Sequence, residues 1–131
     1  MNVVIDVSGA AEILFNKGKC NIFGRALNEA TAVFAPDLYV SELTNTLWKY
    51  NIKKTFSFDE CLEYIQDGTN LIHSFIDNKT VWQEAFSEGV KNNHSVYDMF
   101  YLVTARRYNA VLLTVDSELI KICKKSKIQL Y

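Results

Sequence analysis

Short apolar runs alternate with longer segments of mixed character along this chain. The runs 3–5 and 110–115 contain no polar residue other than a threonine near the end of the second. Such runs are typical of strands that are buried on both faces of a parallel sheet. We interpret a third run, 38–40, as another strand, the ambiguous segment 71–76 as an edge strand, and 127–131 as a last strand.

The segments between these runs have helical spacing and helix-capping signals. Ser57 and Glu60 form a capping-box pattern at the start of one helix, and residues 67–69 are expected to form the turn that follows it. The helix over 96–108 is apolar nearly all round, which predicts that it is buried. The predicted helices span 10–15, 21–33, 41–53, 57–66, 80–90, 96–108 and 117–125.

Alternation of strands and helices predicts an α/β fold, with helices on both faces of a parallel sheet. We expect one domain over 1–131, because 131 residues suffice for one core but not for two. The apolar share of 49% and the charged share of 22% are ordinary for a soluble protein. The three cysteines, Cys20, Cys61 and Cys123, show no metal-binding or disulfide spacing.

Neither the amino terminus nor any internal run has the character of a targeting or membrane segment. Residues 1–6 lack a basic region and reach an acid at Asp6, and no apolar run approaches the roughly 20 residues of a membrane span. We therefore expect a cytoplasmic protein with no membrane partner. The net charge of −1 gives no global basic field that would indicate nucleic acid binding.

Four acidic residues stand at the ends of predicted elements. Asp6 and Asp116 follow buried strands, and Glu42 and Asp98 stand near the starts of helices. In a parallel α/β sheet, ligands bind outside the carboxyl ends of the strands, so Asp6, Asp116 and the start of the helix that carries Glu42 are expected at one edge. Asp98 lies two or three residues into its own helix, and its side of the sheet stays open. Asp98 and Asp116 also have apolar sequence neighbours, where an ionised carboxylate is costly unless it is compensated.

Clustered carboxylates without histidine or cysteine ligands favour a hard cation such as Mg²⁺ or Mn²⁺. Such a cation activates water and stabilises the leaving oxygen in phosphodiester cleavage. A structural interpretation stays open for each acid. Ser95 and Asp98 match a capping box, Asp116 or Ser117 could cap the last helix, and Glu42 could be a solvated acid. No phosphate-binding glycine loop, nucleophile elbow or zinc motif is present.

Four segments resemble the PIN-domain family, in particular its VapC-type toxin ribonucleases. The more specific pair reads YDMFYLVTA over 97–105 and AVLLTVDSEL over 110–119, and the others read VVIDVS over 3–8 and VSELTNTL over 40–47. This resemblance implies a PIN-like three-layer α/β/α sandwich with a central parallel sheet of four to five short strands. It also implies an endoribonuclease that depends on Mg²⁺ or Mn²⁺ and is the toxin of a type II toxin–antitoxin pair.

The resemblance further implies roles for single residues and for partners. Such toxins cut RNA, form homodimers and are inhibited by a cognate antitoxin protein. At two points this chain departs from the family, because Val7 replaces a small or hydroxyl residue and Gly9-Ala10 replace a larger apolar pair. The matched positions are Asp6, Glu42, Asp98 and Asp116 as catalytic and metal-binding acids, with Ser8, Asn45 and Thr114 supporting them.

Contacts with RNA are less clearly indicated. Arg106, Arg107, Lys121 and Lys124 could line an approach for the phosphate backbone, or they could be solvated helix faces. Two other functions remain as alternatives. A phosphoacceptor signalling domain would need an acid beside Asp6 and a lysine at a late strand end, and both are missing. A catalytically silent PIN-like module that binds RNA or protein would not need the four acids that this chain retains.

Overall fold

A four-stranded parallel sheet forms the centre of the computed structural model, which describes all residues 1–131. The strand order is β3-β2-β1-β4, so β1 lies inside the sheet and β3 and β4 form its edges. Residues Val3, Val4 and Ile5 of β1 are completely buried, as the unbroken apolar run predicts. The strands are β1 (Asn2–Ile5), β2 (Ala32–Pro36), β3 (Ser74–Ile76) and β4 (Ala110–Leu113).

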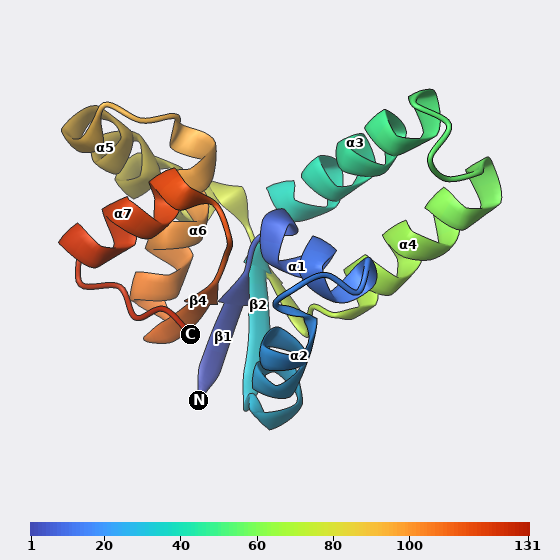
Figure 1. The fold of residues 1–131 in the computed structure, drawn as a ribbon. Coiled ribbons are helices and arrows are strands. Elements are labelled where there is room, and N and C mark those ends of the chain that lie inside the picture. Colours follow the sequence, from blue (N-terminus) through green and yellow to red (C-terminus); the bar gives the residue numbers. More distant parts are fainter.

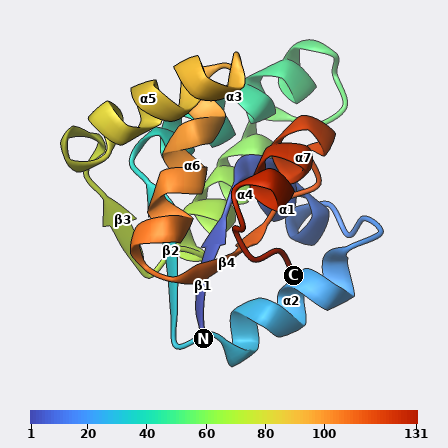
Figure 2. The same ribbon diagram turned by 90° about the vertical axis from the view of Figure 1, so that its left-hand side faces the viewer.

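Helices cover both faces of this sheet (Figures 1 and 2). The α5–α6 pair lies on one face, and α1 to α4 lie on the other, with α3 and α4 packed together as a hairpin (Figure 1). The predicted three-layer α/β/α fold is thus confirmed. The helices are α1 (Val7–Leu14), α2 (Cys20–Glu29), α3 (Leu38–Ile52), α4 (Phe58–Asn70), the 3₁₀ turn Asn78–Thr80, α5 (Trp82–Asn92), α6 (Val96–Arg107) and α7 (Ser117–Lys125).

Helix α6 packs directly on the sheet, which confirms the prediction of a buried helix. It contacts β1, β2 and β4, and its residues 101–105 are all buried. Its exposed residues are Tyr97 in the first turn and Arg106 and Arg107 in the last. The buried apolar side chains of sheet and helices form one continuous core of 28 residues. No helix has both the length and the apolar character that crossing a membrane would require.

The second strand lies earlier in the chain than its pattern predicts. Residues 32–36 form β2, while 38–40 are the first turn of α3, and α2 ends at Glu29 rather than at residue 33. Strand β2 lies between β1 and β3 and contacts α6, and Val33, Ala35 and Pro36 are its buried residues. Pro36 ends the strand, and the N–H of Asp37 continues the ladder to β3 by donating to Ile76 O at 2.9 Å.

A glycine read as a turn residue lies inside a helix instead. The capping box of Ser57 and Glu60 is confirmed, but α4 continues through residues 67–69 to Asn70. A Cβ on Gly68 would lie 2.6 Å from Leu43 Cδ2, so this glycine allows α3 and α4 to pack closely. The predicted last strand is reduced to one isolated bridge between Leu112 and Leu130.

Candidate functional site

The predicted acids meet where the strands end. Helices α1, α3, α6 and α7 all begin near this edge of the sheet, in the upper middle of Figure 1. A pocket of about 260 Å³ opens there. Its lining consists of Asp6, Val7, Ser8, Ala11, Glu42, Thr46, Asp98, Tyr101 and Asp116. The structure therefore brings all four predicted acids to one pocket, which we call the acid pocket.

Asp6 is the most deeply buried of these acids, with 6% of its surface exposed. It caps α1, because its Oδ1 accepts a hydrogen bond from the Gly9 N–H at 2.8 Å. The Ser8 hydroxyl donates to the same oxygen at 2.7 Å, and the Thr114 hydroxyl donates to Oδ2 at 2.5 Å. These bonds hold an otherwise costly buried carboxylate in place.

Ser8 and Thr114 also join the ends of β1 and β4. Their hydroxyl oxygens are 3.2 Å apart, and Ser8 Oγ accepts a hydrogen bond from the Val115 N–H at 3.1 Å. Thr114 Oγ1 accepts a further bond from the Asp116 N–H, also at 3.1 Å. The resemblance implies that Ser8 and Thr114 support the acids by hydrogen bonds, and both hydroxyl groups donate to Asp6. They link Asp6 to Asp116 through two hydroxyl groups.

The glycine at position 9, where the family has a larger apolar residue, has a structural reason. A Cβ at this position would lie 2.4 Å from the backbone oxygen of Leu113, which is closer than real contacts allow. The first turn of α1 therefore packs directly against the end of β4. This close approach places the Gly9 N–H and the Thr114 hydroxyl on the same carboxylate.

Glu42 enters the pocket from α3. It lies in the second turn of that helix rather than in the first, because α3 begins at Leu38. The Tyr101 hydroxyl of α6 donates to Glu42 Oε1 at 2.6 Å. Tyr101 is 1% exposed, and burial together with the neighbouring Glu42 charge raises its pKa, so it stays a donor. This bond connects residues 59 positions apart.

Asp98 lies in the first turn of α6, where the helix dipole favours a negative charge. The predicted capping box is absent, because the Ser95 side chain makes no capping hydrogen bond. The basic side chain beside Asp98 is that of His94, whose Nε2 lies 3.6 Å from Asp98 Oδ2. Asp98 is therefore not explained by a reciprocal cap.

Asp116 is exposed, so the expectation of a costly carboxylate in apolar surroundings is wrong for this residue. It caps α7 by accepting a hydrogen bond from the Leu119 N–H at 2.9 Å. Its other carboxylate oxygen makes no hydrogen bond within the protein. The capping interpretation of Asp116 is thus confirmed, and it leaves one oxygen available to a ligand.

Burial and mutual repulsion weaken the acidity of three of these groups. Burial raises the pKa of Asp6 to about 6 against the lowering effect of its hydrogen bonds, and the Asp98 charge raises it further. The pKa of Glu42 is also raised, by burial first and then by Asp98 and Asp6. Burial and the Asp116 charge raise the pKa of Asp98, which His94 partly offsets. The four carboxylates therefore lie within electrostatic reach of one another.

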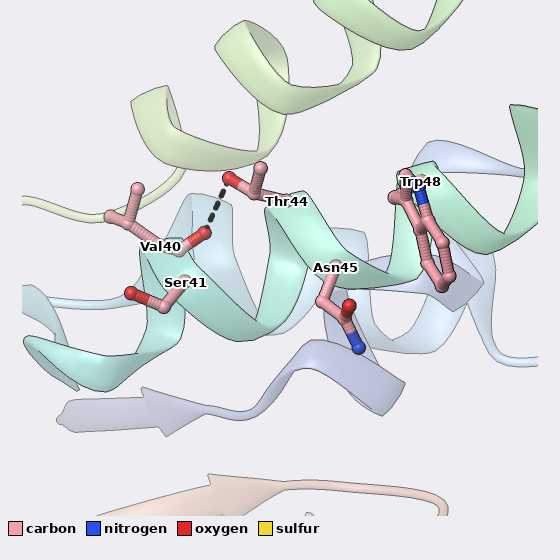
Figure 3. Close-up of a pocket in the computed structure, with 5 residues that line it drawn as sticks. All are labelled: Val40, Ser41, Thr44, Asn45 and Trp48. Atoms are coloured by element: carbon pink, nitrogen blue, oxygen red, sulfur yellow. Dashed lines mark hydrogen bonds between the residues drawn. The ribbon is translucent and has the colours of Figure 1, made fainter.

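Asn45 does not line the acid pocket. It lies on a neighbouring face of α3, in an open hollow with Val40, Ser41, Thr44 and Trp48 (Figure 3). Thr46 lines the acid pocket instead, because it lies four residues after Glu42 and so on the same helix face. Tyr101 was likewise not predicted as a site residue, although its position three residues after Asp98 is a signal for it.

None of the cations predicted to contact RNA lines the acid pocket. Arg106 and Arg107, at the far end of α6, form ion pairs with acids of α5. Lys121 lies 3.4 Å from Glu118 on the exposed face of α7. Lys124 lines a separate hollow of about 420 Å³ with Lys19 and apolar side chains. A role for these four in binding RNA remains a prediction.

The acid pocket suits a hard cation by its chemistry but not by its present spacing. Its possible donors are carboxylate oxygens, which Mg²⁺ and Mn²⁺ prefer. Glu42 and Asp116 each keep one oxygen free of hydrogen bonds to the protein, and Asp98 keeps both. However, no three Asp, Glu, His or Cys side chains are arranged to hold one ion. Side-chain rotation is needed to bring three acids onto one cation.

Fold and site together define a class: a PIN-like three-layer α/β/α domain with an acid pocket at the carboxyl edge of its parallel sheet. No family model matches the chain. The chain is 27% identical over 124 residues to Ribonuclease VapC3 of Pyrobaculum aerophilum, covering 91% of this chain and 92% of that protein. This likeness confirms the resemblance to VapC-type PIN domains.

A solved structure supports the fold independently. The crystal structure of PAE2754 from Pyrobaculum aerophilum matches with a TM-score of 0.76 and 16% sequence identity. The match covers 93% of this chain and 79% of that chain. At this identity the match speaks for the arrangement of strands and helices alone.

Proposed function

We propose that this protein is a metal-dependent endoribonuclease and the toxin of a type II toxin–antitoxin pair. The observation that carries the proposal is the acid pocket, where Asp6, Glu42, Asp98 and Asp116 converge from four elements. Like charges this close are unfavourable unless protons or cations offset them. The likeness to Ribonuclease VapC3 supports RNA as the substrate.

In this proposal Glu42, Asp98 and Asp116 hold Mg²⁺ or Mn²⁺ together with Asp6. The cation, when bound, polarises a phosphate oxygen and lowers the pKa of a bound water. Each acid has a distinct supporting contact. Tyr101 fixes one oxygen of Glu42, and the Leu119 N–H fixes one oxygen of Asp116, so the second oxygen of each is left for the cation.

Asp6 serves as the anchor of this arrangement. Hydrogen bonds from Gly9, Ser8 and Thr114 fix its side chain, so the other acids can be ordered around it. Each carboxylate oxygen has two acceptor positions, so Oδ2 of Asp6 retains one beside its bond to Thr114. These contacts hold the carboxylate in a fixed direction before substrate arrives, which lowers the cost of organising the site.

We also propose the two protein partners that the resemblance implies, a second copy of this chain and an antitoxin. Large apolar side chains exposed on two separate faces support this. One face carries Trp48, Ile52, Phe58 and Leu62 on α3 and α4, and the other carries Trp82, Phe86, Val90 and Tyr97 on α5 and α6. Contiguous exposed apolar surface typically marks an interaction site. Light scattering at a series of concentrations tests the homodimer.

One observation favours the alternative of a catalytically silent module. No three Asp, Glu, His or Cys side chains are arranged to hold one ion, and a module that only binds would not need such an arrangement. In that case the pocket would bind RNA or protein without cutting it. The main proposal expects RNA cleavage that depends on a divalent ion, whereas the alternative expects no cleavage with or without the ion.

Cleavage of labelled RNA by the wild type and by Asp98→Asn, with and without Mg²⁺ or Mn²⁺, is the decisive experiment. The wild type should cut only with the cation. Asp98→Asn should lose more than about 100-fold in rate, because the loss of groups that merely support a ligand already costs 10- to 100-fold. Glu63→Gln on the exposed face of α4 is the matched control and should retain full activity. Equal rates for wild type and Asp98→Asn, or cutting in excess chelator, would refute the mechanism.

A further inference from the structure

A second hollow continues directly from the acid pocket along α3. It measures about 240 Å³ and is lined by Thr46, Lys49, Tyr50 and Lys53. Thr46 also lines the acid pocket, so the two spaces are adjacent. We call the four residues of this hollow the lysine groove.

Helical spacing places both lysines in line with the acids. Glu42, Thr46, Lys49 and Lys53 follow one another at intervals of three or four residues, and therefore lie along one face of α3. At 1.5 Å per residue, the two lysine backbones lie about 10 Å and about 16 Å beyond Glu42 along the helix axis. Long lysine side chains reach part of this distance back towards the pocket.

The charges of the lysine groove are not used by the protein itself. Lys49 and Lys53 are exposed and form no ion pair, and no acidic residue lines the groove. Arg106 and Arg107, by contrast, are both paired with acids. A phosphate group would therefore displace no internal partner of Lys49 or Lys53.

One aromatic ring, that of Tyr50, lines the groove beside these lysines, and two further rings pack against it. Tyr50 packs edge-on against Phe15 with ring centroids 5.1 Å apart, and against Phe56 at 5.3 Å. Lys17 Nζ lies 5.5 Å from the centre of the Phe15 ring, which adds a third cation near these rings. Positive charges that follow a groove beside aromatic side chains are the usual combination for binding single-stranded nucleic acid.

We propose that the lysine groove binds the phosphate backbone of single-stranded RNA on one side of the cleavage point. Lys49 and Lys53 contact successive phosphates, and Thr46 marks the passage to the acids. Exposed lysines beside an aromatic residue suit an unpaired strand, so single-stranded RNA is its proposed substrate class. This inference rests on the proposed ribonuclease function and adds the residues that hold the substrate.

RNA binding by proteins that cannot cut tests the groove separately from catalysis. Fluorescence anisotropy would follow a labelled single-stranded RNA of mixed sequence binding to Asp98→Asn and to Asp98→Asn with Lys49→Gln and Lys53→Gln. The added substitutions should weaken binding about tenfold, as expected for two exposed ion pairs. The slope of log K against log salt should become shallower by about 1.4, because each phosphate contact on a single strand contributes about 0.7.

Two further proteins serve as controls. Lys79→Gln with Lys91→Gln makes the same change in net charge at exposed lysines outside the groove, and should leave affinity and salt slope unchanged. Lys49→Arg with Lys53→Arg keeps both charges and should retain binding. In the catalytically intact protein, Lys49→Gln with Lys53→Gln should raise KM for RNA while kcat stays the same.

The possible outcomes separate the groove from the nuclease. Equal weakening by the groove pair and the control pair overturns the lysine groove, while RNA cleavage by the wild type still supports the nuclease. Loss of binding in the groove pair alone supports the groove, even if the wild type cuts no RNA. If labelled polyglutamate binding depends on Lys49 and Lys53 but RNA binding does not, the groove serves an acidic protein and the proposal is overturned.

Discussion

Helix α6 carries an acid in its first turn and two arginines in its last. The arginines form ion pairs with α5, whereas the acid lies among other acids. At the last turn, Arg106 lies 2.9 Å from Glu88 and Arg107 lies 3.0 Å from Glu84, both on α5. At the first turn, Asp98 forms no ion pair with a lysine or arginine. Its basic neighbour is His94, at 3.6 Å, and it shares its pocket with three further acids.

The charges at the last turn are paired within the chain and stabilise the fold, whereas those at the first turn repel one another and would be stabilised by a bound cation. The paired end satisfies its charges within the chain and stabilises the contact between α5 and α6. The acid pocket collects like charges, which helix starts and hydrogen bonds offset only in part. Stability should therefore respond in opposite ways when charge is removed at the two ends.

The largest expected effect is a pH dependence of stability that originates at Asp6. Its pKa is about 6 in the folded protein and 3.8 in the absence of structure, so between these values the folded state binds more protons. The free energy of unfolding therefore falls as pH rises from about 4 to about 6, by about 3 kcal/mol, since each pKa unit corresponds to about 1.4 kcal/mol.

Urea unfolding at a series of pH values, without divalent ions, measures this effect. Asp6→Asn is the matched variant, because asparagine also caps a helix but does not titrate. The free energy of unfolding of the wild type, minus that of the variant, should fall by about 3 kcal/mol between about pH 4 and about pH 6. If the free energy of unfolding varied with pH in the same way for both proteins, the pKa of Asp6 would not be raised by folding.

A divalent cation should stabilise the wild type by nearly as much. Mg²⁺ or Mn²⁺ at 100 times its dissociation constant raises the free energy of unfolding by about 2.7 kcal/mol if it binds only the folded state. Thermal melting with and without the ion checks this. Asp98→Asn should show a much smaller rise in Tm, whereas Glu84→Gln at the paired end should respond like the wild type. A rise of equal size in all three proteins would indicate binding elsewhere.

Removal of a charge at the paired end should destabilise the protein. Arg106→Met leaves Glu88, which is 8% exposed, without its cation, and should lower the free energy of unfolding by about 2 kcal/mol. Lys91→Met, an exposed lysine of α5 without an ion pair, should change it by less than about 0.5 kcal/mol. Urea unfolding at neutral pH compares the two, and equal losses would refute a structural role for the pair.

The smallest expected effect has the opposite sign and arises in the acid pocket. Asp98→Asn removes one of the repelling charges, and should raise the free energy of unfolding by about 1 kcal/mol at neutral pH without divalent ions. Because Asp98 is partly exposed, solvent screening keeps the gain small. Thermal melting in chelator tests the sign. A lower Tm for Asp98→Asn would mean that the pair with His94 outweighs the repulsion.

Elements whose pattern is contained within their own residues were predictable. The buried strands β1 and β4, the buried helix α6 and the bounds of α7 follow from local apolar runs and caps, as does the capping box of α4. The meeting of Asp6, Glu42 and Asp116 at one edge was also predictable, because parallel strands present their carboxyl ends to the same side. The place of Asp98 beside them depended on how α6 packs on the sheet.

Features that depend on contacts between distant segments were not predictable in the same way. The boundary between β2 and α3 depends on which neighbours bury residues 32–40, and Gly68 serves the packing of α3 on α4 rather than a turn. The bond from Thr114 to Asp6 spans 108 residues, and its partners are recognisable only once β1 and β4 are paired.

The sequence by itself determined the kind of fold and the acids of the candidate site, because hydrophobic period and strand ends are local properties. Tertiary structure alone decided which charges are satisfied. It paired Arg106 and Arg107 with α5, left Lys49 and Lys53 free beside the acid pocket, and placed Tyr101 on Glu42. The physical reason is that a charge acquires its energy from whatever lies within a few ångströms of it, and the chain order does not encode that distance.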